Sequence, residues 1–165
     1  MKQACTHFLT DTNFKCGNKS IPSMGILLGK IVGYVFPIQS QHAKSIFELG
    51  KNVFSKFSRY GKLRAGMKAI FYVSGKKYLI GEACIKRVER MTTETLWRNY
   101  PTALFLTKKE LFDYAKMSPL GIERKTKELS VYVLDDIKEY IKPKYIKRKM
   151  TPSGYYMTEN EYLSL

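Results

Sequence analysis

The sequence is poor in acidic residues and in the residue types that most often bind metals or carry out hydrolysis. Its 165 residues include 14 Asp and Glu against 29 Lys and Arg, with only two His, three Cys and one Trp. The cysteines form no CxxC pair, so neither a zinc ribbon nor a disulfide framework is indicated. No HExxH, GxSxG or glycine-rich phosphate loop occurs. We therefore expect no metal site, no cofactor and none of these catalytic classes.

Long hydrophobic segments are also missing. No apolar run approaches the roughly 20 residues that a membrane-spanning helix needs. The N-terminus lacks the apolar core of a secretory signal. A chain of 165 residues suits one folded domain. We expect a soluble, cytoplasmic monomer with no membrane partner.

The positive charge is abundant, and it is unevenly distributed. Residues 51–81 contain eight Lys and Arg and no acid, and residues 138–149 contain six Lys and Arg and one acid. Residues 91–137 contain seven of each sign and are neutral. A charge that serves solubility alone would be spread evenly, whereas this segregation favours a polyanionic partner such as nucleic acid. A lysine-rich proteome would also give a high total charge.

Residues 31–57 predict a compact β–α–β unit around which the rest of the chain is organised. Residues 31–36 are β-branched and aromatic, and the strand is expected to end at Pro37. Ser40 is a candidate N-cap for a helix of about three turns. Gly50 is placed where a helix C-terminus needs a positive φ. Residues 53–57 alternate as a half-buried strand does.

The later segments predict a small curled sheet with peripheral helices. Strands are expected at 67–73, 78–89 and 129–134, with a bulge or bend near Gly81. Thr92 or Thr93 begins a short helix, and Thr107 and Glu110 form a capping box for another. Residues 1–24 have neither helical nor strand periodicity. We expect them to be a disordered extension, or to result from a start codon assigned too far upstream. We expect residues 25–165 to form the folded domain.

Three segments carry a resemblance to a known family. They are VFPIQSQHAKSIFELGK (35–51), MKAIFYVSGKKYLIGEACIKRVE (67–89) and LFLTKKELFDY (104–114). Together they resemble an archaeal family of uncharacterised proteins in the PUA-like superfamily, which also contains the PUA, ASCH and EVE domains. The resemblance implies an α+β fold, a PUA-like β-pseudobarrel of curled mixed sheet with short peripheral helices.

The same resemblance implies a binding pocket beside the first helix. In relatives such as EVE domains a modified or flipped base is thought to enter there. Carried over by position, this predicts a pocket rim formed by two segments: Ser40, Gln41 and Lys44, with Thr151, Ser153, Gly154 and Tyr155 on the far side. Gln41 offers both a donor and an acceptor for a base edge.

A catalytic function is less well supported. Some ASCH relatives are amidohydrolases of modified nucleosides, with a G-x-K-T-x-E type string after the first helix. Here Lys51 matches the lysine, but Asn52 or Val53 replaces the threonine and the string has no acid. Glu82 is the candidate carboxylate, with no hydroxyl nucleophile beside it. His42 is interpreted as a surface or capping residue, and Cys84 as a small buried hydrophobe.

We predict an RNA-binding protein that holds single-stranded, modified or flipped bases on a basic surface containing aromatic residues. The target could be tRNA, rRNA or a modified base. The predicted nucleic-acid-binding residues combine cations for phosphates with Tyr60 and Tyr72 for stacking: Lys51, Lys56, Arg59, Tyr60, Lys62, Arg64, Tyr72, Lys76 and Lys77. Two alternatives remain open, namely a small ASCH-like amidohydrolase and a module that docks on an acidic protein or on the ribosome.

Overall fold

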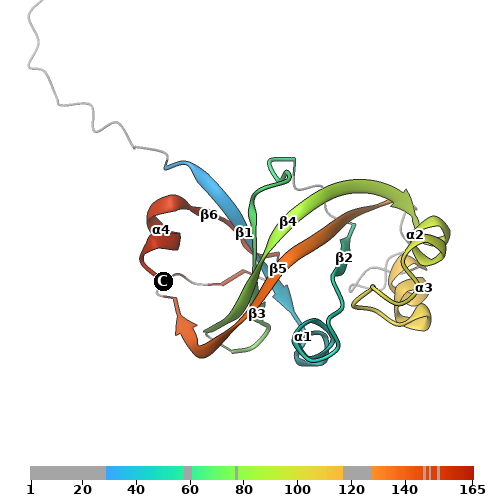
Figure 1. The fold of residues 1–165 in the computed structure, drawn as a ribbon, viewed down its shortest axis with the longest axis horizontal. Helices are drawn as coiled ribbons and strands as arrows, with labels where there is room; N and C mark the ends of the chain where they lie inside the picture. Colours follow the sequence, from blue (N-terminus) through green and yellow to red (C-terminus); the bar gives the residue numbers. More distant parts are fainter. Residues whose placement is uncertain are drawn as a thin grey trace, which may run out of the picture.

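The computed structural model describes residues 29–57, 61–76, 78–116, 128–146, 148, 150, 151 and 153–165 (Figure 1). The predicted extension, residues 1–24, lies outside this set. The described residues form six strands and four helices. None of these helices is long and apolar enough to span a membrane.

The six strands form one curled mixed sheet that does not close into a barrel. The strand order is β2-β5-β4-β3-β1-β6, with β1 and β3 parallel and every other pair antiparallel. The strands are β1 (Ile31–Ile38), β2 (Val53–Lys56), β3 (Lys68–Val73), β4 (Tyr78–Thr92), β5 (Glu128–Tyr145) and β6 (Tyr155–Thr158). This confirms the predicted fold class, an α+β curled sheet with short helices.

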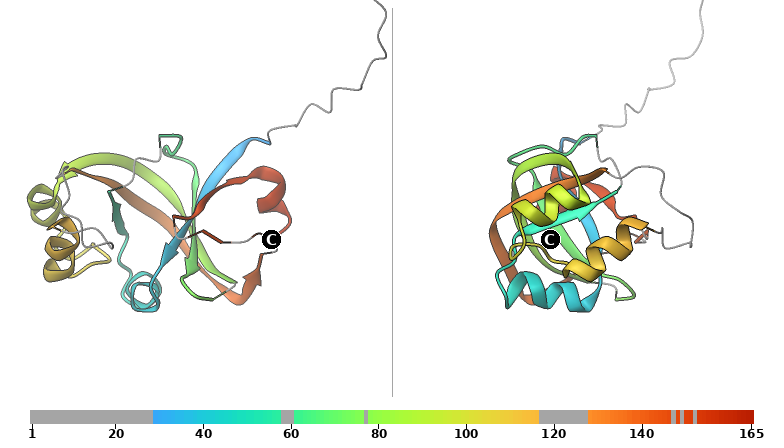
Figure 2. Two further views of the ribbon diagram at one scale, coloured as in Figure 1. Left: turned by 180° about the vertical axis from the view of Figure 1, so that it is seen from behind. Right: turned by 90° about the vertical axis from the view of Figure 1, so that its right-hand side faces the viewer.

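Four short helices lie at the periphery of the sheet. They are α1 (Ser40–Phe47), α2 (Thr93–Asn99), α3 (Lys108–Lys116) and α4 (Glu159–Leu163). Figure 2 shows α2 and α3 together at one end of the molecule and α4 at the opposite end. Helix α1 lies between them, directly after the end of β1. The chain therefore leaves the sheet at Ile38, forms one helix and returns as the edge strand β2.

Strands β4 and β5 are unusually long and bend together over the sheet (Figure 1). Their pairing shifts register at three places, one of them between Leu79 and Gly81, which confirms the bulge predicted near Gly81. A side chain at Gly81 would collide with the carbonyl of Lys138 and with the ring of Phe47 from α1. The glycine thus allows α1 to pack directly on the bend.

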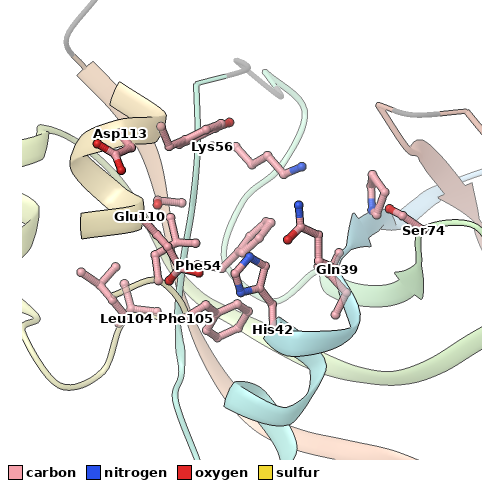
Figure 3. A pocket seen from close by; sticks show the side chains of 15 residues that line it. Gln39, His42, Phe54, Lys56, Ser74, Leu104, Phe105, Glu110 and Asp113 are labelled. Carbon is pink, nitrogen blue, oxygen red and sulfur yellow. The ribbon is translucent and has the colours of Figure 1, made fainter. Parts of the chain in front are cut away.

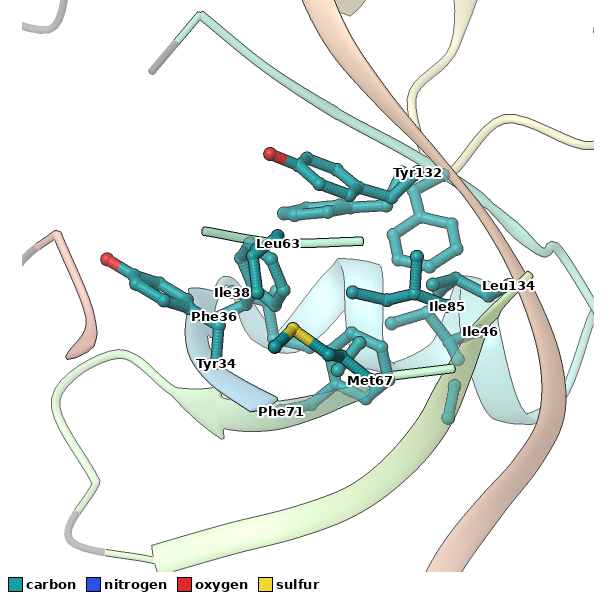
Figure 4. Close-up of a cluster of buried hydrophobic side chains, with 14 residues drawn as sticks. Tyr34, Phe36, Ile38, Ile46, Leu63, Met67, Phe71, Ile85, Tyr132 and Leu134 are labelled. Atoms are coloured by element: carbon teal, nitrogen blue, oxygen red, sulfur yellow. The ribbon is translucent and has the colours of Figure 1, made fainter. Parts of the chain in front are cut away.

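Buried side chains fall into three clusters on the two faces of the sheet. The largest lies inside the curl and is rich in aromatic residues, among them Phe36, Phe54, Phe71 and Tyr132 (Figure 4). Phe36 and Phe54 meet edge to face, with ring centroids 4.9 Å apart. This contact brings β1 and β2 to opposite sides of one core although they do not pair. A second cluster lies under α2 and α3, and a third lies on the outer face of β1 and β3.

The helix boundaries correct two expectations. The N-cap of α1 is Gln39, and Ser40 is the first helical residue; no side chain caps this end. Strand β1 does not stop at Pro37 but continues to Ile38. The hydrogen-bonded pairing of β1 with β6 ends at Val35, so the N–H that Pro37 lacks is not needed for that pairing. Gly50 has the expected positive φ of 62°.

Two other predicted caps are confirmed. Thr92 caps α2, its hydroxyl accepting the backbone N–H of Thr95. Thr107 and Glu110 make both hydrogen bonds of a capping box, at 3.3 Å and 2.8 Å. The second bond fixes where α3 begins and therefore which of its side chains face the sheet.

Candidate functional site

A cavity of about 540 Å³ opens where the curled sheet fails to close (Figure 3). Its walls come from the end of β1, the first turn of α1, the edge strand β2, the segment before α3, and α3 itself. Strand β1 gives way to α1 at this point, and the two edge strands of the sheet, β2 and β6, do not pair with each other.

The walls are mainly apolar, with a few polar groups between them. The apolar and aromatic lining residues are Pro37, Ile38, Val53, Phe54, Leu104, Phe105, Leu106 and Tyr114. The polar and charged lining residues are Gln39, His42, Ser55, Lys56, Ser74, Glu110 and Asp113. An apolar cavity of this size with a few converging polar groups is typical of a small-molecule or single-base site.

Ser55 is the most informative of the polar lining residues. It is 6% exposed, and its hydroxyl oxygen has no hydrogen-bond partner within the described part of the chain. A buried hydroxyl without a partner costs about 1–3 kcal/mol, so such groups are uncommon in folded proteins. The oxygen is itself shielded from solvent, so a ligand in the cavity would reach it only if the side chains around Ser55 shift on binding.

Lys56 and His42 bring titratable groups to opposite sides of the same space. Burial lowers the pKa of the Lys56 amine, which lies 5.6 Å from the ring centre of Phe54. Figure 3 shows this amine directed toward the side of the cavity where Gln39 and Ser74 lie. Burial also lowers the pKa of His42, since the opposing effect of Glu110 is outweighed. Burial in the cavity wall thus favours the uncharged form of the His42 imidazole.

Glu110 holds the two helical walls together. One carboxylate oxygen accepts the backbone N–H of Thr107 at 2.8 Å, and the other accepts the Gln41 side-chain amide at 3.0 Å. The hydrogen bond from Thr107 keeps the pKa of Glu110 below its ordinary value. One residue thus starts α3 and connects it to α1 across the cavity.

The predicted phosphate-binding residues are dispersed around this region. Lys56 lines the cavity, and Lys51 is close enough to act electrostatically on both His42 and Glu110. Lys76 lies in the turn that follows Ser74. Lys62 lies farther along the sheet, its amine 5.8 Å from the ring centre of Tyr156.

The other residues predicted to bind nucleic acid are not among the described residues that line the cavity. Arg64 is exposed and is not a lining residue. Arg59, Tyr60 and Lys77 lie outside the described residues, so the stacking role predicted for Tyr60 stays a prediction.

Tyr72 requires a correction, because its ring is not available for stacking. Strand alternation does place it on the face opposite Phe71, as the sequence predicts. That face is covered, however, and Tyr72 is only 8% exposed in a cluster with Tyr155 and Met157 of β6. Side chains from the segment after β5 and from α4 and the residues after it pack against this cluster, among them Ile146, Tyr162 and Leu165.

The predicted pocket rim is close to the cavity but does not form its walls. Ser40, Gln41 and Lys44 belong to α1, yet the α1 residue that lines the cavity is His42. Gln41 acts from outside through Glu110, and Lys44 pairs with Glu48 at 3.6 Å on the exposed face.

The residues predicted for the far side of the rim are held against β1 and against one another by hydrogen bonds. The hydroxyl of Tyr34 donates to the carbonyl of Ser153 at 2.8 Å, and Thr151 donates to the carbonyl of Gly154 at 2.7 Å. Tyr155 pairs with Val35. These contacts fasten the segment to β1 beside Pro37, and none of its members lines the cavity.

Sequence reasoning missed one complete wall of the cavity. From the sequence alone, residues 104–114 are assigned to the family resemblance and to a capped helix, and they are given no part in a binding site. Their role depends on contacts with β2, where Val53 accepts the N–H of Phe105 at 3.1 Å. One sequence feature could have indicated that β2 lines a cavity: Ser55 and Lys56 are polar residues at the end of a strand that is otherwise apolar.

The arrangement does not favour the amidohydrolase alternative. Glu82, the candidate carboxylate, lies in a separate cluster, where it accepts hydrogen bonds from Lys68, Tyr140 and Tyr162. In the cavity, Ser55 makes no hydrogen bond to a base among the described residues. An activated nucleophile is recognised by that hydrogen bond. No group of three or more His, Cys, Asp or Glu that could hold a metal occurs in the described segments.

Comparison with solved structures defines the class of fold. The ASCH protein of Zymomonas mobilis matches with a TM-score of 0.66 at 18% identity, covering 80% of this chain and 92% of the other. A point variant of that protein matches with a TM-score of 0.68 at 19% identity, covering 83% and 96%. The fold is therefore of the PUA-like type found in ASCH domains.

The comparison with protein families then places the chain. Residues 31–159 match the family described as a domain of unknown function, DUF365. The match covers most of the chain, and the protein belongs to this family. No curated protein matches the sequence.

Proposed function

We propose that this protein binds RNA and holds one unstacked base, standard or modified, in the cavity between α1, β2 and α3. The observation that carries the proposal is a cavity of about 540 Å³ whose lining combines apolar and aromatic side chains with His42, Gln39 and Lys56. Bases present hydrogen-bonding edges and flat apolar faces, and the cavity offers a partner for each.

The lining accounts for how a base would be held. Tyr114 supplies a partly exposed ring and His42 a partly exposed imidazole, whereas Phe54 and Phe105 are 7% and 3% exposed and form the apolar floor. Aromatic stacking contributes about 1–3 kcal/mol per base and tolerates different bases. The exposed side-chain amide of Gln39 is the group best placed to read the base edge.

The charges around the opening support a nucleic acid over a free neutral ligand. Lys56 reaches into the cavity, Lys51 lies beside α1, and Lys76 lies in the turn after Ser74. A polymer with regularly spaced phosphates can contact several such cations at once. Base entry requires an unpaired nucleotide, so single-stranded RNA or an RNA loop suits the site better than an intact duplex.

A fluorescence anisotropy titration with labelled uridine and adenosine hexanucleotides at two salt concentrations tests this proposal. The matched variants are Lys56→Gln in the cavity and Lys86→Gln on the sheet, where Lys86 forms an exposed pair with Asp135. We expect Lys56→Gln to weaken binding and to reduce the slope of log K against log salt by about 0.7, the value for one phosphate contact on a single strand. Lys86→Gln should behave as wild type.

Two results would count against the proposal. Binding that does not change with salt would mean that phosphates are not contacted. Equal losses in Lys56→Gln and Lys86→Gln would show that only total charge matters, which favours the docking-module alternative. Competition by UMP or AMP, read from the displaced hexanucleotide, then reports occupancy of the cavity itself.

A further inference from the structure

A second aromatic site lies near the cavity, at the free end of the β4–β5 ribbon. Tyr145, the last residue of β5, is 76% exposed, a high value for a large aromatic side chain. It pairs across the ribbon with Tyr78, and the two ring centroids are 5.9 Å apart at an interplanar angle of 71°. Tyr78 therefore supports Tyr145 from one side and leaves most of it open to solvent.

The surface around this pair is cationic. The amine of Lys76 lies 5.7 Å from the ring centre of Tyr78. Lys142 is exposed on the same end of β5. Cations beside an exposed ring are the combination that single-stranded nucleic acids bind, since phosphates and base faces alternate along the strand.

The tyrosine pair is connected to the cavity by one short turn. Ser74 lines the cavity and donates its backbone N–H to Ile38, another lining residue, at 2.9 Å. The chain from Ser74 to Tyr78 can span at most about 14 Å, with Lys76 midway. A strand leaving the cavity over this turn would meet the amine of Lys76 first and the ring of Tyr145 next.

We infer that Tyr78 and Tyr145 form a stacking platform for the RNA segment that flanks the base in the cavity, with Lys76 contacting the phosphate between the two. This inference rests on the proposed function and extends it from a single-base site to a path along the protein. It assigns a role to an exposed aromatic residue that neither the core nor the cavity uses.

The test compares ligands that reach the platform with ligands that do not. Hexanucleotides of uridine and of adenosine are titrated against wild type, Tyr145→Ala and Tyr145→Phe, and UMP and AMP are titrated against the same proteins. Leu163→Ala is the matched control, because Leu163 is 77% exposed on α4. We expect Tyr145→Ala to weaken hexanucleotide binding about tenfold and to leave monophosphate binding unchanged. Tyr145→Phe and Leu163→Ala should stay near wild type.

Each contrary outcome has a distinct meaning. Unchanged hexanucleotide affinity in Tyr145→Ala overturns the platform and leaves the cavity proposal intact. An equal loss for hexanucleotides and monophosphates in that variant overturns the platform as well, since the effect would then be global. Failure of UMP and AMP to bind wild type, with hexanucleotide binding still sensitive to Tyr145→Ala, counts against the cavity and supports the platform.

Discussion

The side-chain amide of Gln41 donates a hydrogen bond to Glu110 at 3.0 Å and so joins α1 to α3 across the mouth of the cavity. The two residues are 69 positions apart. Each helix contributes residues to the cavity, His42 from α1 and Asp113 from α3. The bridge therefore holds the two walls at a fixed separation, and Glu110 itself forms part of the lining.

Gln41→Ala should weaken ligand binding more than it weakens the fold. The bridge is exposed, so its loss should lower the free energy of unfolding by no more than about 1 kcal/mol. The two walls would then have to be ordered when the ligand binds, which costs about 0.5–1.5 kcal/mol and lowers RNA affinity by about two- to tenfold. Anisotropy titration and urea unfolding of the same preparation measure both quantities.

Thr107→Ala provides the control for this prediction. It removes the cap of α3, at a cost of about 1 kcal/mol, and leaves the Gln41–Glu110 hydrogen bond available. Its effect should therefore appear mainly in stability. An RNA affinity of Gln41→Ala equal to that of wild type would show that the bridge does not order the cavity.

Ser55→Ala should lower RNA affinity without lowering the stability of the protein. Removal of a buried hydroxyl that has no partner in the described structure costs no hydrogen bond, so the free energy of unfolding should stay the same or rise. If the hydroxyl contacts the base, affinity for the hexanucleotides should fall by about 1 kcal/mol, or roughly fivefold. Wild-type affinity in a fully stable Ser55→Ala would remove Ser55 from the proposed site.

Gly81→Ala should be strongly destabilising, because the added methyl group would enter the space of the Phe47 ring and the Lys138 carbonyl. Overpacking of this kind costs about 1–3 kcal/mol. Gly61→Ala is the matched control, since a side chain there meets nothing within 4 Å and should change stability by less than about 0.5 kcal/mol. Urea unfolding of both variants measures the difference, and similar values would contradict the packing of α1 on the bend.

The Glu82 cluster should stabilise the protein over a defined pH range. Burial raises the pKa of Glu82, but hydrogen bonds from Tyr140, Lys68 and Tyr162 outweigh it and bring the pKa below its ordinary value of 4.5. Stability from Glu82 is then fully present above pH 4.5 and is lost as the pH falls through the lower folded-state pKa. Glu82→Gln should lower the free energy of unfolding by about 1–3 kcal/mol at pH 7.

The difference between wild type and Glu82→Gln should therefore shrink as the pH falls below 4.5. Burial and the hydrogen bond to Glu82 raise the pKa of Tyr140, so its contribution is lost only as the pH rises above 10. Glu139→Gln makes the same charge change at an exposed position and should show little effect at any pH. A constant difference between pH 3 and pH 7 would contradict the depressed pKa of Glu82.

Local sequence patterns were sufficient for most of the fold. Capping boxes and glycine positions depend on neighbours within a few residues, so Thr107, Glu110 and Gly50 could be interpreted correctly. Tyr72 shows the limit of such patterns. Alternation indicates which face of a strand a residue occupies, but whether that face is covered depended on segments that follow β5, far later in the sequence.

The candidate site was predicted only in part for the same reason. The position beside the first helix followed from the family resemblance, and Lys56 was included because it lies in the basic stretch. Ser55 and the wall from Leu104 to Tyr114 became recognisable only when β2 and that segment were seen to meet. A cavity whose walls come from segments far apart in the sequence has no signature in any one of those segments.

The pairing of β1 with β6 also has a consequence for synthesis of the chain. Tyr34 is bound to Ser153, 119 residues later, so one side of β1 has no partner until β6 has been synthesised. An unpaired strand edge with buried aromatic residues is prone to intermolecular pairing. Nascent chains that stall before residue 155 should therefore be the aggregation-prone species, and chaperones that shield strand edges should engage this protein late in translation.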